Sequence, residues 1–256
     1  MTPQQAFAQK EVLEFLRTWR IWVLAIPLLI FAIGGPIFTY FEPIILESAL
    51  DVYGDGTIEI AIPQPTWIDS YQQWAGILKH VVPVVLLVIA GSSIAGEVTS
   101  GTALPILTAG LKRRDFVLIK YAVISAIAFV TITIGTLINW VVGRVIFPEM
   151  RFIGVIAIIG VASLLALLLI ALAIFASTFM PDALSSIGLE MFIFLLFAVA
   201  ALWSPARRFS PAGLLSSISD LAQTGSADFL APAIATILLT IVLLGLAVRI
   251  FQRREL

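Results

Sequence analysis

Long apolar runs alternate with shorter polar stretches along the whole of this chain. An apolar helix needs about 20 residues to cross the hydrocarbon core of a bilayer, and six of the runs approach or exceed that length. The pattern therefore predicts an all-α polytopic membrane protein with six transmembrane helices, in which residues 1–256 form a single transmembrane domain. The expected spans cover about residues 21–41, 71–95, 116–142, 152–179, 187–203 and 229–250.

The residues before the first span combine apolar positions at helical spacing with charges. Phe7 and Phe15 lie about two helical turns apart, with lysine and glutamate between them. We interpret residues 3–19 as an amphipathic helix on the membrane surface; a solvated start to the first span is the alternative. The apolar run of residues 21–41 is longer than the roughly 7 to 15 residues of a signal-peptide core, so we interpret it as an uncleaved signal anchor.

Two stretches between the spans carry further structural signals. Residues 42–71 contain six carboxylates and neither lysine nor arginine, which predicts a polar loop on the outer side of the membrane, with a short strand over 57–62. In residues 204–228, leucine and isoleucine recur at helical spacing after two prolines. This pattern predicts one or two short amphipathic outer helices, lying in or dipping into the interface between the fifth and sixth spans.

Composition supports the membrane assignment and removes several kinds of chemistry. The chain is 60 % hydrophobic and only 12 % charged, whereas soluble domains carry roughly 25 % charged residues. Its mean hydropathy is +1.07. With no cysteine and a single histidine, His80, disulfides, thiolate metal sites and multi-histidine metal sites are excluded. The net charge of −1 offers no support for nucleic acid as a partner.

The side of each loop follows from the positions of lysine and arginine. In the six-span arrangement ten of these residues fall on one side and four on the other, with Lys79 inside the second span. The positive-inside rule places the richer side, and with it both termini, in the cytoplasm. We therefore expect a multi-pass protein of the plasma membrane, of the bacterial inner-membrane type. The richer side carries Lys10, Arg17, Arg20, Lys112, Arg113, Arg114, Lys120, Arg249, Arg253 and Arg254, and the poorer side Arg144, Arg151, Arg207 and Arg208.

No catalytic constellation is recognisable in the chain. Gly91 and Gly96 have the spacing of a phosphate-binding loop, but Glu97 follows where a lysine is needed, and a carboxylate repels phosphate. An HExxH motif and a supported GxSxG motif are both missing. We therefore expect no enzyme activity, no catalytic residue, no metal site and no cofactor in this chain.

Five polar residues inside the expected spans are candidates for a substrate path. Ionisable groups are expensive inside a membrane and often mark such paths. For Lys79 and His80, snorkelling to the interface or a structural partner is the alternative. The hydroxyl of Thr136 can instead bond to its own helix or across a helix pair, and Glu190 is explained more simply as an interfacial carboxylate facing water. The candidates are Lys79, His80, Thr136, Asn139 and Glu190.

The polar interruption between the second and third spans, residues 91–121, has the character of a docking segment. Glu97 ends the second span, and Gly101 permits a sharp change of direction. Residues 102–108 then form a short, partly apolar segment in which Leu104 is available to something other than lipid. A short helix parallel to the membrane on the cytoplasmic face would suit a groove in a partner protein.

The chain resembles the permeases of the type 2 ABC transporter family, also classed as type V ABC exporters. The resemblance covers essentially the whole chain, including the amphipathic start and the count of six spans. It implies that residues 3–19 are an elbow helix, that residues 99–108 are a coupling helix received by a separate ATPase subunit, and that residues 205–221 supply outer hairpin helices. The positions that carry it are Glu97, Gly101-Thr102, Leu107, Arg114 and Lys120.

The resemblance implies a function for the chain and for its partners. The chain would be the membrane-spanning subunit of an ATP-driven exporter, forming the translocation path beside a second permease subunit in a homodimer or heterodimer. Separate ABC ATPase subunits would bind ATP and Mg. Spans with few charges favour an amphipathic, lipidic or peptide-like substrate. The residues expected to couple to the ATPase are Glu97, Gly101, Thr102, Leu104, Leu107 and Arg114.

Some positions depart from the family pattern. Many members carry a charged run around the glutamate and a proline before the arginine, whereas this chain has Val-Thr-Ser at residues 98–100 and Gly110 at the expected proline. Pro105 falls inside the implied coupling helix, where it has to occupy the first turn or cause a kink. Two other functions compete with export: a membrane scaffold or sensor that docks a cytoplasmic partner without transport, and an ion or proton channel based on Lys79, His80 and Glu190.

Overall fold

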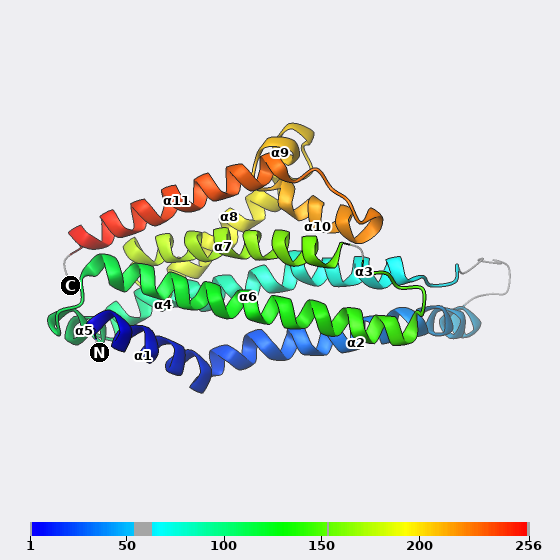
Figure 1. Cartoon of the computed structure of the whole chain (residues 1–256), viewed down its shortest axis with the longest axis horizontal. Helices are drawn as coiled ribbons and strands as arrows, with labels where there is room; N and C mark the ends of the chain where they lie inside the picture. Colours follow the sequence, from blue (N-terminus) through cyan, green and yellow to red (C-terminus); the bar gives the residue numbers. More distant parts are fainter. Residues whose placement is uncertain (1, 54–62, 153, 255–256) are drawn as a thin grey trace.

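The computed structural model describes residues 2–53, 63–152 and 154–254, and every regular element in these residues is helical. Six helical runs are long and apolar enough to cross a membrane, as the hydropathy pattern predicts. Figure 1 shows these runs side by side in one elongated bundle. They are α2 (Trp19–Tyr53), α3 (Trp67–Gly76) with η1 (Ile77–Val81) and α4 (Val82–Thr99), α6 (Arg113–Ile146), α7 (Val155–Phe179), α8 (Ala183–Ala200) and α11 (Leu230–Arg253).

The prediction of a polar loop over residues 42–71 is wrong at both ends of that range. Helix α2 continues to Tyr53, past three prolines, and α3 already begins at Trp67. Hydropathy reports where a helix leaves an apolar environment, whereas the helix itself ends only where its backbone hydrogen bonds end. Exposed polar residues such as Glu42 are compatible with helix. The strand predicted over 57–62 lies outside the described residues.

Helix α7 occupies the centre of the bundle and packs against α4, α6, α8 and α11. Most of its side chains are buried, including Ala171, Ala173 and Ala176. Small residues let helices approach closely, which matters inside a membrane because lipid tails are as apolar as the side chains themselves. By contrast α2, α8 and α11 leave many apolar side chains exposed, as expected of helices that face lipid.

Both ends of the chain lie at the same end of the bundle (Figure 1). Helix α1 (Pro3–Arg17) is there, starting at a capping box formed by Thr2 and Gln5. The short helix α5 (Ala103–Thr108) lies beside it. The aromatic ring of Phe7 in α1 stacks on that of Phe116 in α6, with 5.2 Å between centroids. The predicted helix before the first span is therefore confirmed, and its place on a membrane surface stays a prediction.

The helices α9 (Ser204–Phe209) and α10 (Gly213–Thr224) lie in the stretch where short helices are predicted between the fifth and sixth spans. In α10 the apolar residues Leu214, Ile218 and Leu221 are buried, and the helix packs on α3 and α7. The helical spacing is thus confirmed. The apolar face of α10 is covered by the bundle, however, rather than left for lipid.

The fifth expected span, residues 187–203, is displaced toward the N-terminus. Helix α8 begins at Ala183 because Asp182 caps it, accepting a hydrogen bond from the backbone N–H of Ser185 at 2.9 Å. This bond and a second one from the Ser185 hydroxyl hold the pKa of Asp182 below its ordinary value. Helix α8 ends at Ala200, and α9 follows after a short turn.

Candidate functional site

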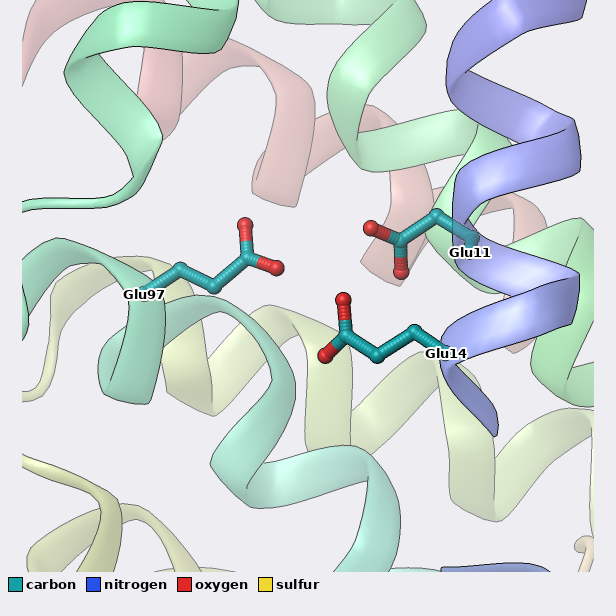
Figure 2. Close-up of side chains that lie close together, drawn as sticks. All are labelled: Glu11, Glu14 and Glu97. Carbon is teal, nitrogen blue, oxygen red and sulfur yellow. The ribbon is translucent and has the colours of Figure 1, made fainter. Parts of the chain in front are cut away.

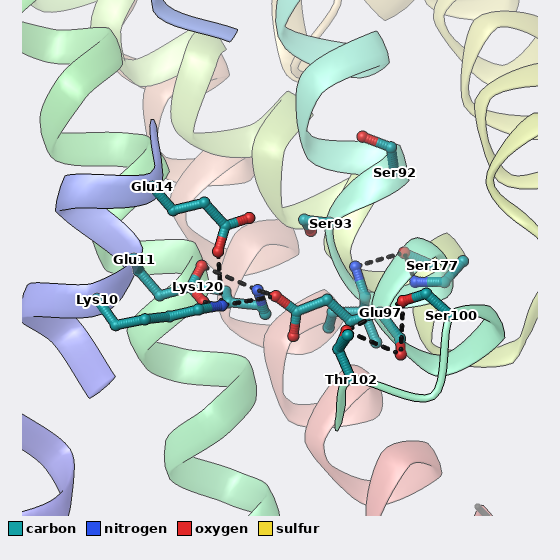
Figure 3. Close-up of polar contacts among 12 residues, drawn as sticks. Lys10, Glu11, Glu14, Ser92, Ser93, Glu97, Ser100, Thr102, Lys120 and Ser177 are labelled. Carbon is teal, nitrogen blue, oxygen red and sulfur yellow. Dashed lines mark hydrogen bonds and ion pairs between the residues drawn. The ribbon is translucent and has the colours of Figure 1, made fainter. Parts of the chain in front are cut away.

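A buried lysine joins three helices at the end of the bundle that holds both termini. Lys120 of α6 is 0 % exposed, and its Nζ lies 2.8 Å from Glu11 Oε2 of α1 and 2.9 Å from Glu97 Oε1 of α4. Figure 3 shows the three side chains converging from their separate helices. A buried charge is tolerated when it is paired and hydrogen-bonded, as Lys120 is here.

Further charges extend this pairing toward solvent. Lys10 Nζ lies 2.6 Å from Glu14 Oε2, 2.9 Å from Glu11 Oε1 and 3.0 Å from Glu97 Oε1. Arg20 adds a contact of 3.5 Å to Glu14 Oε1. Three cations therefore balance three carboxylates. We call this set the charged junction; its members are Lys10, Glu11, Glu14, Arg20, Glu97 and Lys120.

The three carboxylates of the charged junction also come close enough together to suggest a metal site. Oxygen atoms of Glu11, Glu14 and Glu97 all lie within 4.8 Å of one another (Figure 2). The amines of Lys10 and Lys120, however, bond to the same oxygens and already neutralise their charge. We therefore assign these carboxylates to ion pairing.

The end of α4 connects the charged junction to α5. The side chain of Glu97 pairs with the two lysines, while its backbone carbonyl accepts weak hydrogen bonds from the hydroxyls of Ser100 at 3.3 Å and Thr102 at 3.4 Å (Figure 3). Gly101, at φ 72°, makes the reversal, and this left-handed conformation favours glycine. One residue thus touches α1, α6 and the turn that leads into α5.

Helix α5 is shorter than the implied coupling helix over 99–108. Thr99 still belongs to α4, and α5 starts only at Ala103, because the turn at Gly101 intervenes. Pro105 is the third residue of α5 and so lies in its first turn, where a missing N–H costs nothing. Gly110, at φ 96°, ends the segment.

The residues expected to couple to an ATPase differ in accessibility. Gly101, Thr102, Leu104 and Arg114 are exposed, and Leu107 is half-buried. Leu104 is 52 % exposed, so it is accessible to a partner. Glu97 differs, because its side chain points into the charged junction instead of toward a partner.

Two of the substrate-path candidates lie on α6 and have structural partners. The hydroxyl of Thr136 donates to the carbonyl of Ile132 at 2.8 Å and accepts from Trp74 Nε1 at 3.2 Å. This confirms the alternative in which the threonine bonds within its own helix and across a helix pair. Asn139 Nδ2 reaches the carbonyl of Ala32 on α2 at 3.4 Å, a long contact. Its buried Oδ1 has no partner within the described part of the chain.

The interpretation of Glu190 as an interfacial carboxylate facing water is wrong. Its side chain is 0 % exposed and accepts a hydrogen bond from Ser186 at 2.6 Å, while Oε2 has no partner among the residues described. It points at Gly91 of α4, where a Cβ would lie 2.6 Å from Glu190 Oε2. The missing side chain at Gly91 therefore provides the space for the carboxylate.

The remaining two candidates, Lys79 and His80, belong to the π-helical segment η1. Lys79 Nζ donates to Ser219 Oγ of α10 at 2.5 Å, and His80 Nδ1 lies 2.9 Å from the carbonyl of Gly76. A structural partner, one of the two alternatives to a path role, is thus present for Lys79. Lys79 and His80 are consecutive and line one cavity, and no hydrogen bond between any two of the five candidates is seen in the described residues.

Residues 60–256 match a family model described as Protein of unknown function (DUF2705). The chain belongs to this family. A comparison with curated proteins found no match. Glu97 and Lys120 lie inside the region that matches DUF2705, whereas the α1 members of the charged junction precede it.

Most of the charged junction is not apparent from the sequence of this DUF2705 member. Glu97 stands out there for its place at a helix end, and Lys120 only through the resemblance to ABC permeases. A usable signal exists for Glu11, which lies four positions after Phe7 and four before Phe15 and so shares their buried face. A carboxylate on an apolar helix face predicts a buried cation, but not which cation.

The solvent side of the charged junction is sensitive to pH. Burial would favour neutral Lys10, yet its hydrogen bonds and charge attraction with Glu14 and Glu11 prevail and raise its pKa. Burial would raise the pKa of Glu14, but Lys10 lowers it below the ordinary 4.5. A lowered carboxyl pKa stabilises the fold at neutral pH and stops doing so as the pH falls through the folded-state value. The Lys10 contribution is fully present below its ordinary pKa of 10.5 and is lost as the pH rises above that value.

Glu14 pairs with Lys10 of α1 and with Arg20 of α2, so we expect α1 to separate from the start of α2 in acid and to stay docked from weakly acidic to weakly alkaline pH. The chain has no cysteine, so nitroxide labels on Gln9→Cys in α1 and Val23→Cys in α2, both exposed positions, report this distance cleanly. The distance distribution should broaden at about pH 4 relative to neutral pH. Glu14→Gln should already be broadened at neutral pH and change less on acidification. The same distance distribution at pH 4 and at neutral pH would contradict the assignment of the Glu14 ion pairs to holding α1 in place.

Proposed function

We propose that this protein is the membrane-spanning subunit of an ATP-driven ABC exporter and that α5 is the helix that docks a separate ATPase subunit. The observation that carries this is the position of α5. It protrudes at the end of the bundle that holds both termini, exposes Leu104, and is joined through Gly101 to the charged junction. The resemblance to type 2 ABC permeases supports the same assignment. ATP and Mg would belong to the partner chain, and no chemistry is assigned to this one.

The charged junction gives the proposed docking helix a route into the bundle. A displacement of α5 acts on the end of α4 at Glu97, whose carboxylate contacts Lys10 of α1 and Lys120 of α6. Breaking these contacts would leave buried charges unpaired, so α1, α4 and α6 are expected to move together. Motion received at one short helix would thereby reach three elements, including two membrane spans.

Charge distribution supports a cytoplasmic location for this end. Lys112 and Arg114 lie at the start of α6 and Arg249 and Arg253 at the end of α11, and Figure 1 shows both helix ends at the end of the bundle that holds the termini. All four side chains are exposed. Basic residues of this kind are retained in the cytoplasm and contact anionic headgroups. Both termini are then cytoplasmic in a plasma membrane of the bacterial inner-membrane type.

The exposed apolar faces of the bundle are compatible with a second permease subunit and with a weakly polar substrate. Residues of α2 and α8 such as Ile30, Phe38 and Leu195 are exposed, and such faces suit lipid or another transmembrane helix. We propose a dimer, either homomeric or heteromeric, that moves an amphipathic, lipidic or peptide-like substrate. The dimer follows from the family resemblance and the cargo from the small number of charges in the spans, and these exposed faces are compatible with both.

Co-expression with a candidate ABC ATPase subunit tests the proposal. In nanodiscs the complex should hydrolyse ATP faster than the ATPase alone. Leu104→Asp should weaken the complex at least about tenfold, or about 1.4 kcal/mol, because it places a charge in an apolar contact. Gln252→Asp is the matched control, since it adds the same charge at an exposed position at the same end.

Three outcomes separate the competing functions. If the Leu104→Asp complex stays intact and its ATPase activity is fully stimulated, α5 is not the docking helix. Assembly without ATPase stimulation, and without any conformational response to nucleotide, would favour the scaffold or sensor. A current through liposomes that is lost when Lys79, His80 and Glu190 are all replaced would favour a channel.

A further inference from the structure

A cavity of about 350 Å³ lies away from the charged junction, toward the opposite end of the bundle, where α8, α9, α10 and η1 meet. One side is polar, with charged and hydroxyl side chains from three elements. The other side is apolar and comes from α8. The residues that matter here are Lys79, His80, Arg207, Ser219, Asp220 and Leu202.

Lys79 is the least compensated lysine among those that the structure places inside the bundle. It is half-buried within a candidate membrane span, and its hydrogen bond goes to the neutral hydroxyl of Ser219. Among the described residues no carboxylate lies within 4.0 Å of its Nζ. Lys10 and Lys120, by contrast, each contact at least two carboxylates. A partly desolvated ammonium attracts an anion, and this cavity gives one access to it.

Of the two further polar groups on this side, Arg207 points to the same ligand chemistry and His80 does not. His80 Nδ1 is held by the carbonyl of Gly76, which can only accept, so Nδ1 carries the proton; Nε2 of the neutral ring is then an acceptor and offers an anion no hydrogen bond. Arg207 lines the cavity from α9 and is exposed. With histidine neutral, Lys79 and Arg207 give two positive charges against one negative charge on Asp220, a net charge of +1. π-helical segments such as η1 are rare and frequently occur at functional sites.

The apolar side of the cavity continues along the surface of α8. Leu195 and Val199 lie one turn apart on α8, Leu202 follows in the turn after the helix ends, and the three side chains are 59 %, 57 % and 85 % exposed. Exposed arginines in α9 mark the level of water or headgroups, because arginine is costly in hydrocarbon. The cavity therefore joins a net positive polar pocket to a lipid-facing apolar strip.

We propose that this cavity binds the phosphodiester headgroup of an anionic phospholipid. Lys79 and Arg207 provide the charge partners, and the acyl chains lie along Leu195 and Val199 of α8 and Leu202 in the turn after it. A headgroup with a single negative charge neutralises the pocket, which a zwitterionic headgroup does not. This site does not depend on the proposed export function.

Lipid titration of the full, delipidated chain in detergent, followed by native mass spectrometry, tests the site. Phosphatidylglycerol should bind more tightly than phosphatidylcholine. Lys79→Gln and Arg207→Gln should each weaken phosphatidylglycerol binding about tenfold, the scale of one charged hydrogen bond. Arg151→Gln removes an exposed arginine that does not line the cavity, and it should leave binding unchanged. Arg207 is exposed, so its variant keeps the test valid even if Lys79→Gln perturbs folding.

The same titration contains the results that would overturn the proposal. Equal affinity for the two lipids would show that the cavity does not select an anionic headgroup. An equal loss of binding in Arg151→Gln would show that general surface charge, rather than this cavity, attracts the lipid. Unchanged binding in both cavity variants would show that the lipid does not bind in this cavity. Inorganic phosphate is the competing source of the same chemistry. If it displaces the lipid at low millimolar concentration and binds without it, the cavity takes free phosphate and the lipid assignment falls.

Discussion

Replacing Lys120 with methionine should cost up to about 3–5 kcal/mol of folding free energy, because the variant leaves two buried carboxylates with only the exposed Lys10 to pair with them. Methionine fills a similar volume, so the loss would come from charge rather than from a cavity. Glu11 and Glu97 are both less than 10 % exposed, and water does not replace the missing amine. Unfolding by sodium dodecyl sulfate in mixed micelles, followed by tryptophan fluorescence, measures the change.

Two further variants distinguish the cost of leaving buried charges unpaired from the effect of removing all the buried charges together. Lys112→Met, at an exposed position that precedes the same helix, should change stability by less than about 0.5 kcal/mol. Combining Lys120→Met with Glu11→Gln and Glu97→Gln should recover a substantial part of the loss, since removing all the charges of a buried set is often nearly neutral. If the triple variant is as unstable as Lys120→Met, the loss arises from packing and the charged junction is not its cause.

Alanine at Gly213 should destabilise the fold by about 1–3 kcal/mol, because the added methyl group has no space. A Cβ at this position would overlap the backbone carbonyl of Arg207 and lie 2.7 Å from Pro232 Cγ. A backbone carbonyl cannot rotate away as the end of a side chain can, so α9 and α10 would have to separate. The same micelle titration would report the change as an earlier transition.

Gly188 provides the matched control for this substitution. It lies inside α8, and no heavy atom lies within 4 Å of the place that an added methyl group would take, so Gly188→Ala should be neutral or stabilise the helix by up to about 1 kcal/mol. Arg207 lines the proposed lipid cavity, so Gly213→Ala should also weaken phosphatidylglycerol binding. Wild-type stability in Gly213→Ala would mean that α9 and α10 do not pack as closely as described.

The sequence anticipates the elements of this protein far better than it anticipates their contacts. Helical spacing is enough to locate α1 and α10, because each is amphipathic and the period of 3.6 residues is visible in the letters. It does not show what covers each apolar face. For α10 the expected cover is the membrane interface, and the bundle itself provides it.

Glu190 shows why the rotation of a helix could not be read from the sequence. Helix α8 is apolar on nearly every side, so its sequence carries little periodic signal to distinguish an inward from an outward face. Packing against α4 decides the question, because Gly91 leaves room at the one point where the carboxylate can enter. The same residue that imitates a phosphate-binding loop in the sequence has a steric role in the structure.

The sequence by itself determined the class of protein, its six candidate spans and the short helix α5, because hydropathy, length and glycine conformation are local properties. Only the tertiary structure decided that Lys120 meets Glu11, 109 positions away, and Glu97, 23 positions away. It also decided that Lys79 faces Ser219 rather than a carboxylate. Ion pairs and cavities depend on which helices become neighbours, and that outcome is set by the packing of the whole bundle around α7.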